Sequence, residues 1–248
     1  MYIVTAPPVG QVENETTAEI AAVNPRILLI EDDRRLAEMV ANYLGEYGCA
    51  MTAVHAGNAG ISLHARENFD AVILDLMLPD IDGVEVTRRL REWTQMPILV
   101  LSAVGEEDRK VEALAAGADD YVTKPFGPRE LVARLEAVLR RAAPEGAAPE
   151  IVADGLEIDL AARTVKRDGE PVHLTPTEFG LLRTLARNRG RLMTHRTLLV
   201  EVWGVEYEDD FQVLRAHIAN LRRKIEPAGG DGPKYIKTDP GVGYRFAE

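Results

Sequence analysis

The sequence is poor in cysteine, with only Cys49 in 248 residues. A single thiol excludes a disulfide within the chain and any CxxC metal site. No apolar run approaches the roughly 20 residues that a helix needs to cross a bilayer. The first 24 residues lack the basic start and apolar centre of a secretory signal, so we expect a flexible extension there. Together these absences predict a cytoplasmic protein with no membrane partner.

Acidic residues outnumber basic ones, and the net charge of −11 is unevenly spread. Residues 1–143 hold 23 acidic and 14 basic side chains, whereas residues 151–248 hold 15 of each. The length favours two domains, and the Ala- and Pro-rich residues 143–150 are typical of a linker. We therefore expect one domain over 25–142 and another over 151–248. Because the second is neutral overall, nucleic-acid binding there depends on whether its basic side chains cluster.

Strand and helix patterns alternate through the first domain. The predicted strands are residues 26–30, 50–54, 71–75, 97–101 and 120–123, separated by segments with apolar residues three or four apart. Five such units predict an α/β fold, a five-stranded doubly wound parallel sheet. In sheets of this kind, ligands bind beyond the carboxyl ends of the strands.

Carboxylates stand where two of these strands end. Asp75 closes the apolar run 71–75, and Glu31 and Asp32 follow the first strand. Carboxylates that share a site repel one another unless a hard divalent cation lies between them, and Mg²⁺ suits such a site. The alternatives are that Asp75 caps a strand exit and that the other acids open a helix, the role we favour for Asp33.

A hydroxyl and an ammonium group are expected at the same edge of the sheet. Ser102 follows the fourth strand and Lys124 the fifth. A metal site, a carboxylate nucleophile, a cation and a hydrogen-bond donor are the parts needed to transfer a phosphoryl group onto a carboxylate. The set therefore predicts phosphoryl transfer to Asp75.

These motifs resemble the receiver domain of two-component response regulators. The matching segments are Ile27–Asp33, Leu74–Gly83, Leu101–Ala103, Gly117–Asp120 and Lys124–Phe126. The resemblance implies that Asp75 accepts a phosphoryl group from a sensor histidine kinase. It also implies roles for the neighbouring residues: Glu31, Asp32, Asp75 and the Met77 backbone carbonyl at a Mg²⁺ site, Ser102 and Tyr121 as the switch pair, and Lys124 as the phosphoryl-binding lysine.

The same resemblance implies a homodimer that forms on phosphorylation. The dimer face would combine the fourth helix, fifth strand and fifth helix of the receiver. Its matching residues are Lys110, Asp119, Asp120, Glu130 and Arg134. The alternative is that these are solvated surface charges, which individually contribute only about 0–1 kcal/mol.

The second domain has a different pattern. Short strands are predicted at 151–153, 156–160, 164–167 and 172–174, with a hairpin turn at Asp168-Gly169. Thr175, Pro176 and Glu178 open a helix, because they can form a capping box with proline in the first turn. Two further helices and a C-terminal hairpin follow, so we expect an α+β domain.

Over residues 151–247 the second domain resembles the winged-helix DNA-binding domain of the OmpR/PhoB family. The matching segments are residues 175–178, residues 202–204, the last of these helices and residues 241–245. At about 100° per residue, the apolar side chains of that helix, Phe211 included, point inward, and its basic ones lie on the opposite side. The predicted contacts to promoter DNA are Arg215, Ala219, Arg222, Arg223, Lys237, Thr238 and Arg245. The alternative for the helix is a solvated basic face. The acidic loop before it, which includes Glu206 and Glu208, can contact RNA polymerase in this family.

We expect a transcription regulator, and not an enzyme beyond its own phosphoryl transfer and slow autodephosphorylation. Residues 192–196 and 202–204 resemble regulators of potassium-uptake operons. Two alternatives stay open. One is a receiver that dimerises without phosphorylation, and the other is a Mg²⁺-dependent phosphohydrolase. The second arises because Asp80-Ile81-Asp82-Gly83 resembles the DxD element of haloacid-dehalogenase-like enzymes, although that element should follow a domain's first strand.

Overall fold

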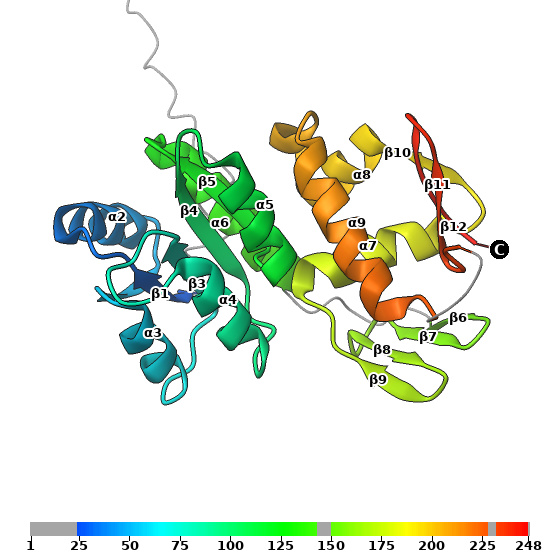
Figure 1. Cartoon of the computed structure of the whole chain (residues 1–248), viewed down its shortest axis with the longest axis horizontal. Coiled ribbons are helices and arrows are strands. Elements are labelled where there is room, and N and C mark those ends of the chain that lie inside the picture. Colours follow the sequence, from blue (N-terminus) through cyan, green and yellow to red (C-terminus); the bar gives the residue numbers. More distant parts are fainter. Residues whose placement is uncertain (1–23, 143–149, 228–231, 248) are drawn as a thin grey trace, which may run out of the picture.

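The computed structural model describes residues 24–142, 150–227 and 232–247, which form two lobes lying side by side (Figure 1). The predicted extension over 1–24 and the linker over 143–150 lie almost entirely outside the described residues. In the part of the chain that the structure describes, no helix is long and apolar enough to span a membrane.

The first lobe is the predicted parallel sheet, with strand order β2-β1-β3-β4-β5 and helices on both faces. Its elements are β1 Arg26–Ile30, α2 Arg34–Glu46, β2 Ala50–Val54, α3 Gly57–His64, β3 Ala71–Asp75, α4 Gly83–Arg91, β4 Ile98–Ala103, α5 Glu107–Ala116, β5 Asp120–Lys124 and α6 Pro128–Ala142. The fourth strand is longer than predicted, because Ser102 and Ala103 continue to pair with β5.

The central strand β3 shows why the sheet has two apolar cores. All five of its residues are buried. Val72 and Leu74 belong to the core under α4 and α5, whereas Ala71 and Ile73 belong to the core under α2 and α6. Successive strand residues point to opposite faces, so a strand covered on both sides is apolar throughout. The charged Asp75 is left at the end of this strand.

Aspartates start three helices of this lobe. Asp33 caps α2 by accepting hydrogen bonds from the backbone N–H groups of Arg35 and Leu36, as expected for a residue that opens a helix. Asp80 accepts from the N–H groups at the start of α3, and Asp82 caps α4 and forms an ion pair with Arg109 at 2.6 Å. Both carboxylates of the DxD-like segment are thus engaged in structural contacts, which weighs against the phosphohydrolase.

The second lobe is α+β, as predicted. It contains β6 Glu150–Ala153, β7 Leu156–Asp159, β8 Thr164–Arg167, β9 Glu170–Val172, α7 Pro176–Arg187, β10 Leu192–Thr194, α8 His195–Val202, a 3₁₀ turn η1 Val205–Tyr207, α9 Phe211–Ile225, β11 Ile236–Asp239 and β12 Gly243–Phe246. The first four strands form one antiparallel sheet, and β10-β12-β11 form another. The helices α7, α8 and α9 lie between the two sheets (Figure 1).

Local signals placed several of these elements correctly. Asp168 and Gly169 have φ values of 53° and 83°, which a two-residue hairpin turn requires, and the predicted capping box at Thr175 is present. Strand β10 was not predicted, because its three residues are held by pairing with β12 and carry no periodic signal of their own. The prediction that Phe211 points inward was wrong, since its side chain is 38% exposed at the first turn of α9.

Candidate functional site

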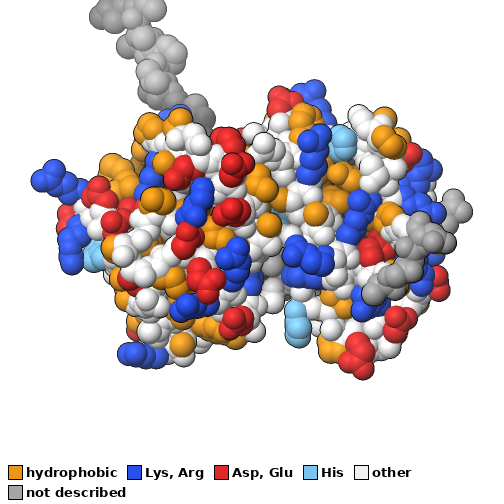
Figure 2. All heavy atoms as spheres, viewed as in Figure 1, with side chains coloured by type: hydrophobic (Ala, Val, Ile, Leu, Met, Phe, Trp, Pro, Cys, Tyr) orange, Lys and Arg blue, Asp and Glu red, His pale blue; other side chains and the backbone are white. Residues whose placement is uncertain are grey.

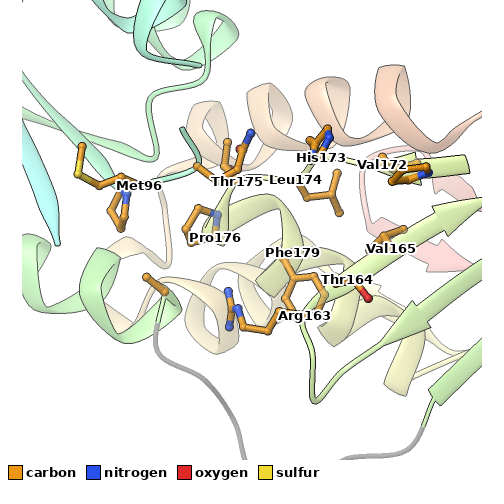
Figure 3. A pocket seen from close by; sticks show the side chains of 14 residues that line it. Met96, Arg163, Thr164, Val165, Val172, His173, Leu174, Thr175, Pro176 and Phe179 are labelled. Atoms are coloured by element: carbon orange, nitrogen blue, oxygen red, sulfur yellow. The ribbon is translucent and has the colours of Figure 1, made fainter. Parts of the chain in front are cut away.

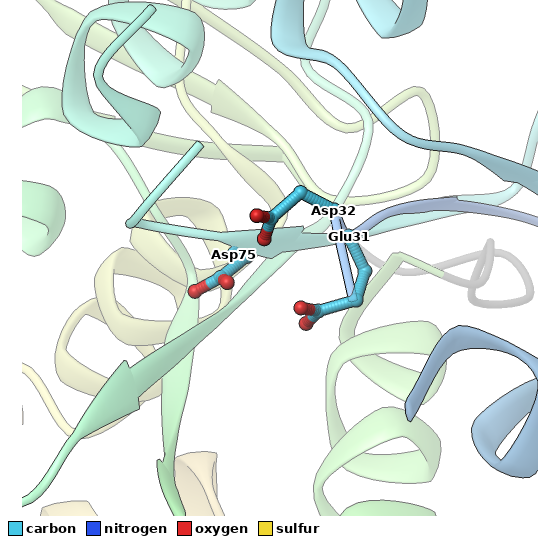
Figure 4. Close-up of side chains that lie close together, drawn as sticks. All are labelled: Glu31, Asp32 and Asp75. Atoms are coloured by element: carbon cyan, nitrogen blue, oxygen red, sulfur yellow. The ribbon is translucent and has the colours of Figure 1, made fainter. Parts of the chain in front are cut away.

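Three carboxylates meet beyond the carboxyl ends of β1 and β3. The two strands are hydrogen-bonded neighbours, so Glu31 and Asp32 emerge beside Asp75. Ligand oxygens of the three side chains all lie within 4.8 Å of one another and point into one space (Figure 4). Glu31 and Asp75 are buried, at 1% and 5% exposure, whereas Asp32 is exposed. The structure thus brings together the acids that the sequence placed at this edge.

Lys124 supplies the positive charge at this site from the end of β5. Its Nζ donates to Glu31 Oε2 at 2.7 Å and to Asp75 Oδ2 at 2.9 Å. Burial raises the pKa of Glu31 to about 7, against the opposing effect of Lys124. Burial alone would lower the pKa of Lys124, but its hydrogen bonds to both carboxylates outweigh that effect and raise it. The lysine is therefore a cation at neutral pH.

The donor set fits Mg²⁺. Its ligands are carboxylate oxygens, which hard cations prefer, and the exposure of Asp32 leaves the side open for the waters that Mg²⁺ retains. A bound ion would reduce the repulsion among the carboxylates and neutralise charge on an incoming phosphoryl group. Met77 follows Asp75 in the same loop, and its N–H donates to Asp75 Oδ1 at 3.3 Å. The role of its carbonyl stays a prediction.

The predicted switch residues, Ser102 and Tyr121, point in different directions. Ser102 is buried, and its hydroxyl donates to the carbonyl of Val122 at 3.5 Å. The hydroxyl of Tyr121 instead donates to Asp210 Oδ2 of the second lobe, at 3.0 Å. The Tyr121 side chain thus reaches across to the other lobe.

Comparisons with known proteins agree with both halves of this architecture. The response regulator receiver domain matches residues 27–136, and the C-terminal domain of transcriptional regulatory proteins matches residues 169–246. The transcriptional regulatory protein KdpE of Mycobacterium tuberculosis is 45% identical over 222 residues, covering 89% of this chain and 98% of the relative. The chain is a response regulator.

Two further comparisons extend this result. The KDP operon transcriptional regulatory protein KdpE of Escherichia coli K12 is 42% identical, covering 89% of this chain and 98% of its own length. A solved structure of a RitR mutant shares 28% identity and a TM-score of 0.73, covering 90% of this response regulator and 98% of the other chain. The first lobe is therefore the receiver, and the second is the DNA-binding domain.

The receiver and the DNA-binding domain of this response regulator share an interface that combines apolar packing with many polar contacts. We call the interdomain interface the surface formed by Leu114, Asp119, Asp120, Tyr121, Arg134 and Arg141 of the receiver with Thr177, Trp203, Tyr207, Asp210, His217 and Asn220 of the other domain. It joins α5, β5 and α6 to α7, α9 and the turn before α9. The interface residues of the DNA-binding domain were not predicted from the sequence. A polar side chain such as His217 is expected to be exposed to solvent unless another domain is known to cover it.

Residues predicted for the dimer face are engaged within one chain. Asp119 and Asp120 are fully buried. Asp119 forms an ion pair with Arg91 at 2.7 Å, and Asp120 forms one with Arg134 at 3.2 Å and accepts a hydrogen bond from Tyr207. Lys110 and Glu130 form ion pairs within the receiver, with Glu107 and Arg134 respectively. The alternative of freely solvated charges is therefore wrong for the two aspartates.

The predicted DNA contacts lie along α9 and on the C-terminal hairpin. Arg215, Ala219 and Arg223 are exposed on α9. Arg222 is half-buried and donates to the Ile236 carbonyl, at 2.6 Å from Nη2, and to Thr238 Oγ1 at 2.8 Å. It therefore also fixes the hairpin against the helix.

On the hairpin itself, Lys237 and Arg245 are cross-strand partners in β11 and β12. Arg245 forms an ion pair with Asp239 at 3.2 Å. The structure thus places the hairpin cations beside each other, on the strands that α9 contacts through Arg222.

A pocket of about 410 Å³ lies at the junction of the domains (Figure 3). Met96 and Pro97 line it from the receiver, and Arg163, His173 and Phe179 line it from the DNA-binding domain. Its lining does not include Glu31, Asp32, Asp75 or Lys124. Its place beside the interdomain interface shows that packing between the domains is incomplete there.

Proposed function

We propose that this response regulator controls transcription of a potassium-transport operon, and that its signal is a phosphoryl group accepted by Asp75 from a sensor histidine kinase. The observation that carries the phosphorylation step is the position of Asp75 beside Glu31 and Asp32, with the Lys124 ammonium 2.9 Å away. The potassium-transport assignment is supported by the similarity to the KDP operon regulator of E. coli.

In the proposed transfer, a carboxylate oxygen of Asp75 forms a bond to phosphorus as the bond from phosphorus to the kinase histidine nitrogen breaks. Lys124 already contacts Asp75, so it can remain hydrogen-bonded to the site and neutralise the added negative charge. Mg²⁺, held by Glu31, Asp32, Asp75 and the Met77 carbonyl, would supply further charge neutralisation. The Ser102 hydroxyl, at the end of the adjacent strand, can then donate to a phosphoryl oxygen.

The downstream step is a population shift towards a form that dimerises through the receiver. Phosphorylation would draw Ser102 and Tyr121 inward and free the face that carries Asp120 and Arg134. Two DNA-binding domains would then be placed on tandem half-sites of promoter DNA in the cytoplasm. The acidic loop before α9 would be available to RNA polymerase. Hydrolysis of the phosphoryl group by the receiver itself would end the signal slowly.

The test compares the full chain with Asp75→Asn, before and after treatment with acetyl phosphate and Mg²⁺. We expect a covalent phosphoryl adduct, dimerisation and tighter promoter binding in the first protein and none of these changes in the second. Unchanged dimerisation and DNA affinity in both proteins would contradict the switch and favour a receiver that acts without phosphorylation.

Mapping bound genomic DNA with and without phosphorylation tests the assignment of the operon. The proposal expects phosphorylation-dependent binding upstream of potassium-transport genes. Phosphorylation-dependent binding only at other promoters would overturn the operon assignment and leave the switch intact.

A further inference from the structure

The exposed side of α9 carries one amide side chain among small and basic ones. We call its members the reading stripe: Gln212, Arg215, Ala216, Ala219 and Arg223, which are exposed or half-buried. At about 100° per residue they fall within about 100° of one another. Gln212 lies near the middle of the stripe, in the first turn of the helix. Figure 2 shows basic side chains following α9 on the visible face of the domain.

Small residues follow Gln212 along the reading stripe. Ala216 and Ala219 stand about one and two turns further on; Ala216 packs partly against the core, and Ala219 is exposed. A helix of about 10–12 Å diameter fills a major groove about 12 Å wide, so long side chains at these positions would hold the backbone away from the base edges. With alanine at both positions, the first turn of α9 can enter deeply enough for Gln212 to reach a base.

The cations of α9 are placed for phosphates. Arg215 lies at one edge of the reading stripe, and Arg223 lies in the last turn, about 16 Å along the axis from Gln212. Arg222 is held by the C-terminal hairpin, through the Ile236 carbonyl. In helix-turn-helix proteins the N-terminal residues of the reading helix contact base edges, and phosphates border the groove. The position that faces the bases is therefore that of Gln212.

The first turn of α9 is fixed before DNA arrives. Asp210 caps the helix, and its Oδ1 accepts a hydrogen bond from the backbone N–H three residues on, at 3.4 Å. The ring of Phe211 meets the ring of His195 edge-on, with 5.9 Å between their centres, and His195 lies 5.4 Å from Tyr244 of β12. The backbone that carries Gln212 is thus held by its cap and by a row of three rings, as a pair of directed hydrogen bonds requires.

The chemistry of the amide selects one base. A glutamine side chain offers an N–H donor and a carbonyl acceptor side by side. In the major groove, adenine presents the N7 acceptor beside the N6 amino donor, whereas guanine presents two acceptors. Cytosine presents a donor alone, and thymine an acceptor beside a methyl group. Adenine is therefore the base that satisfies both groups of the amide.

We propose that Gln212 reads an adenine in each half-site of the promoter DNA. Its amide N–H donates to adenine N7, and its carbonyl oxygen accepts from the N6 amino group. Arg215 and Arg223 bind phosphates and supply affinity without base preference. This inference deepens the proposed function and rests on it, because it names the base that the DNA-binding domain selects.

The test starts from randomised double-stranded DNA, so that no operator has to be assumed. The full chain and Gln212→Ala, each treated with acetyl phosphate and Mg²⁺, are used to enrich bound sequences. Sequences enriched by the parent should share an adenine that the variant does not retain, with the other preferred positions unchanged. Replacing this A·T pair by G·C should lower the affinity of the parent about tenfold and that of Gln212→Ala less than about twofold.

Two further substitutions examine the hydrogen bonds themselves. Replacing the selected adenine by 7-deazaadenine removes the N7 acceptor but keeps the base pair. It should weaken binding of the parent and leave that of Gln212→Ala unchanged. Gln212→Arg should change the preferred base at the same position to guanine, because a guanidinium donates to both O6 and N7.

Arg223→Ala is the matched control within the same stripe. It removes an exposed cation, so it should weaken binding to every sequence alike and reduce the dependence on salt, while the preference for adenine stays. Thermal unfolding checks the fold, and Gln212→Ala should unfold at the same temperature as the parent because Gln212 is exposed.

The inference is overturned if Gln212→Ala keeps the preference for adenine. It is also overturned if this variant binds all sequences equally more weakly, since that is the result of a lost phosphate contact. Failure of the phosphorylation switch looks different: the parent would then bind the enriched sequence equally well with and without acetyl phosphate, while still distinguishing adenine from guanine.

Discussion

The guanidinium carbon of Arg134 in the receiver lies 4.5 Å from the centre of the Tyr207 ring in the DNA-binding domain. Tyr207 also donates its hydroxyl hydrogen to Asp120, the ion-pair partner of Arg134. Three groups from two domains therefore form one buried cluster. Asp120 and Arg134 both belong to the predicted dimer face. Docking of the two domains within one chain and dimerisation of two receivers would therefore compete for the same side chains.

The first prediction concerns the coupling between Arg134 and Tyr207. A double-mutant cycle with Arg134→Met and Tyr207→Leu should give a coupling free energy of about 1–2 kcal/mol in the unphosphorylated chain, because the contact is largely desolvated. Denaturant unfolding measures it. After phosphorylation the coupling should fall towards zero as the domains separate. Equal coupling in both states would show that the interface does not open.

A second prediction concerns Mg²⁺. Asp32→Asn removes one anionic ligand from the exposed side of the site and should weaken Mg²⁺ binding by roughly tenfold or more. Isothermal titration with Mg²⁺ alone measures the affinity, and phosphorylation by acetyl phosphate should slow in parallel. Asp33→Asn is the matched control, because Asp33 caps α2 and asparagine is as good a cap. If both variants bound Mg²⁺ equally, the ion would lie elsewhere.

A third prediction concerns how the contact between the two domains depends on pH. Burial lowers the pKa of His217 to about 4, although Asp119 opposes the shift; Arg141 and Lys224 act in the same direction as burial. The opened or unfolded chain has the ordinary histidine pKa of about 6.5, so it binds the proton more readily. The contribution of His217 is thus complete above about pH 6.5 and is lost as the pH falls towards 4.

At pH 5 this loss amounts to about 2 kcal/mol. The pH dependence of unfolding, compared between the parent and His217→Gln, measures it. Glutamine can still donate to the Asp119 carbonyl but does not titrate. The difference in stability between the two proteins should therefore shrink or reverse between pH 7 and pH 5. A stability difference that stays constant with pH would show that His217 is protonated or exposed to solvent when the two domains are docked.

A fourth prediction distinguishes the roles of Arg215 and Arg222 in α9. Arg215→Ala removes an exposed cation and should weaken DNA binding while leaving the domain as stable as before. If Arg215 contacts a phosphate, the slope of log affinity against log salt concentration falls by about 1. Arg222→Ala should also destabilise the domain, because Arg222 bonds the Ile236 carbonyl and Thr238. Equal stability of the two variants would contradict the structural role of Arg222.

Both folds, and the carboxylates and lysine that meet beyond the ends of the parallel strands, could be predicted from the sequence alone. Helices cover both faces of the sheet, so the first four residues of β3 are apolar. Asp75, the last residue of the strand, is therefore easily recognised in the sequence as the one carboxylate. Parallel strands end at one edge, so the acids that follow β1 and Lys124 at the end of β5 could be placed beside Asp75 without coordinates. Cap residues such as Asp33 and Thr175 could be assigned as well, since capping is a local interaction.

The contacts of the remaining polar residues depend on how the two domains dock, which the sequence pattern does not show. Whether Tyr121 faces Ser102 or Asp210 depends on a contact across 89 residues of sequence, which no local pattern encodes. The burial of His217 likewise depends on which domain covers that side of α9. A helical pattern distinguishes an apolar face from a polar one, but a polar face can meet water, DNA or another domain. The docking of the two domains made that choice, through hydrogen bonds and ion pairs whose partners lie far apart in the chain.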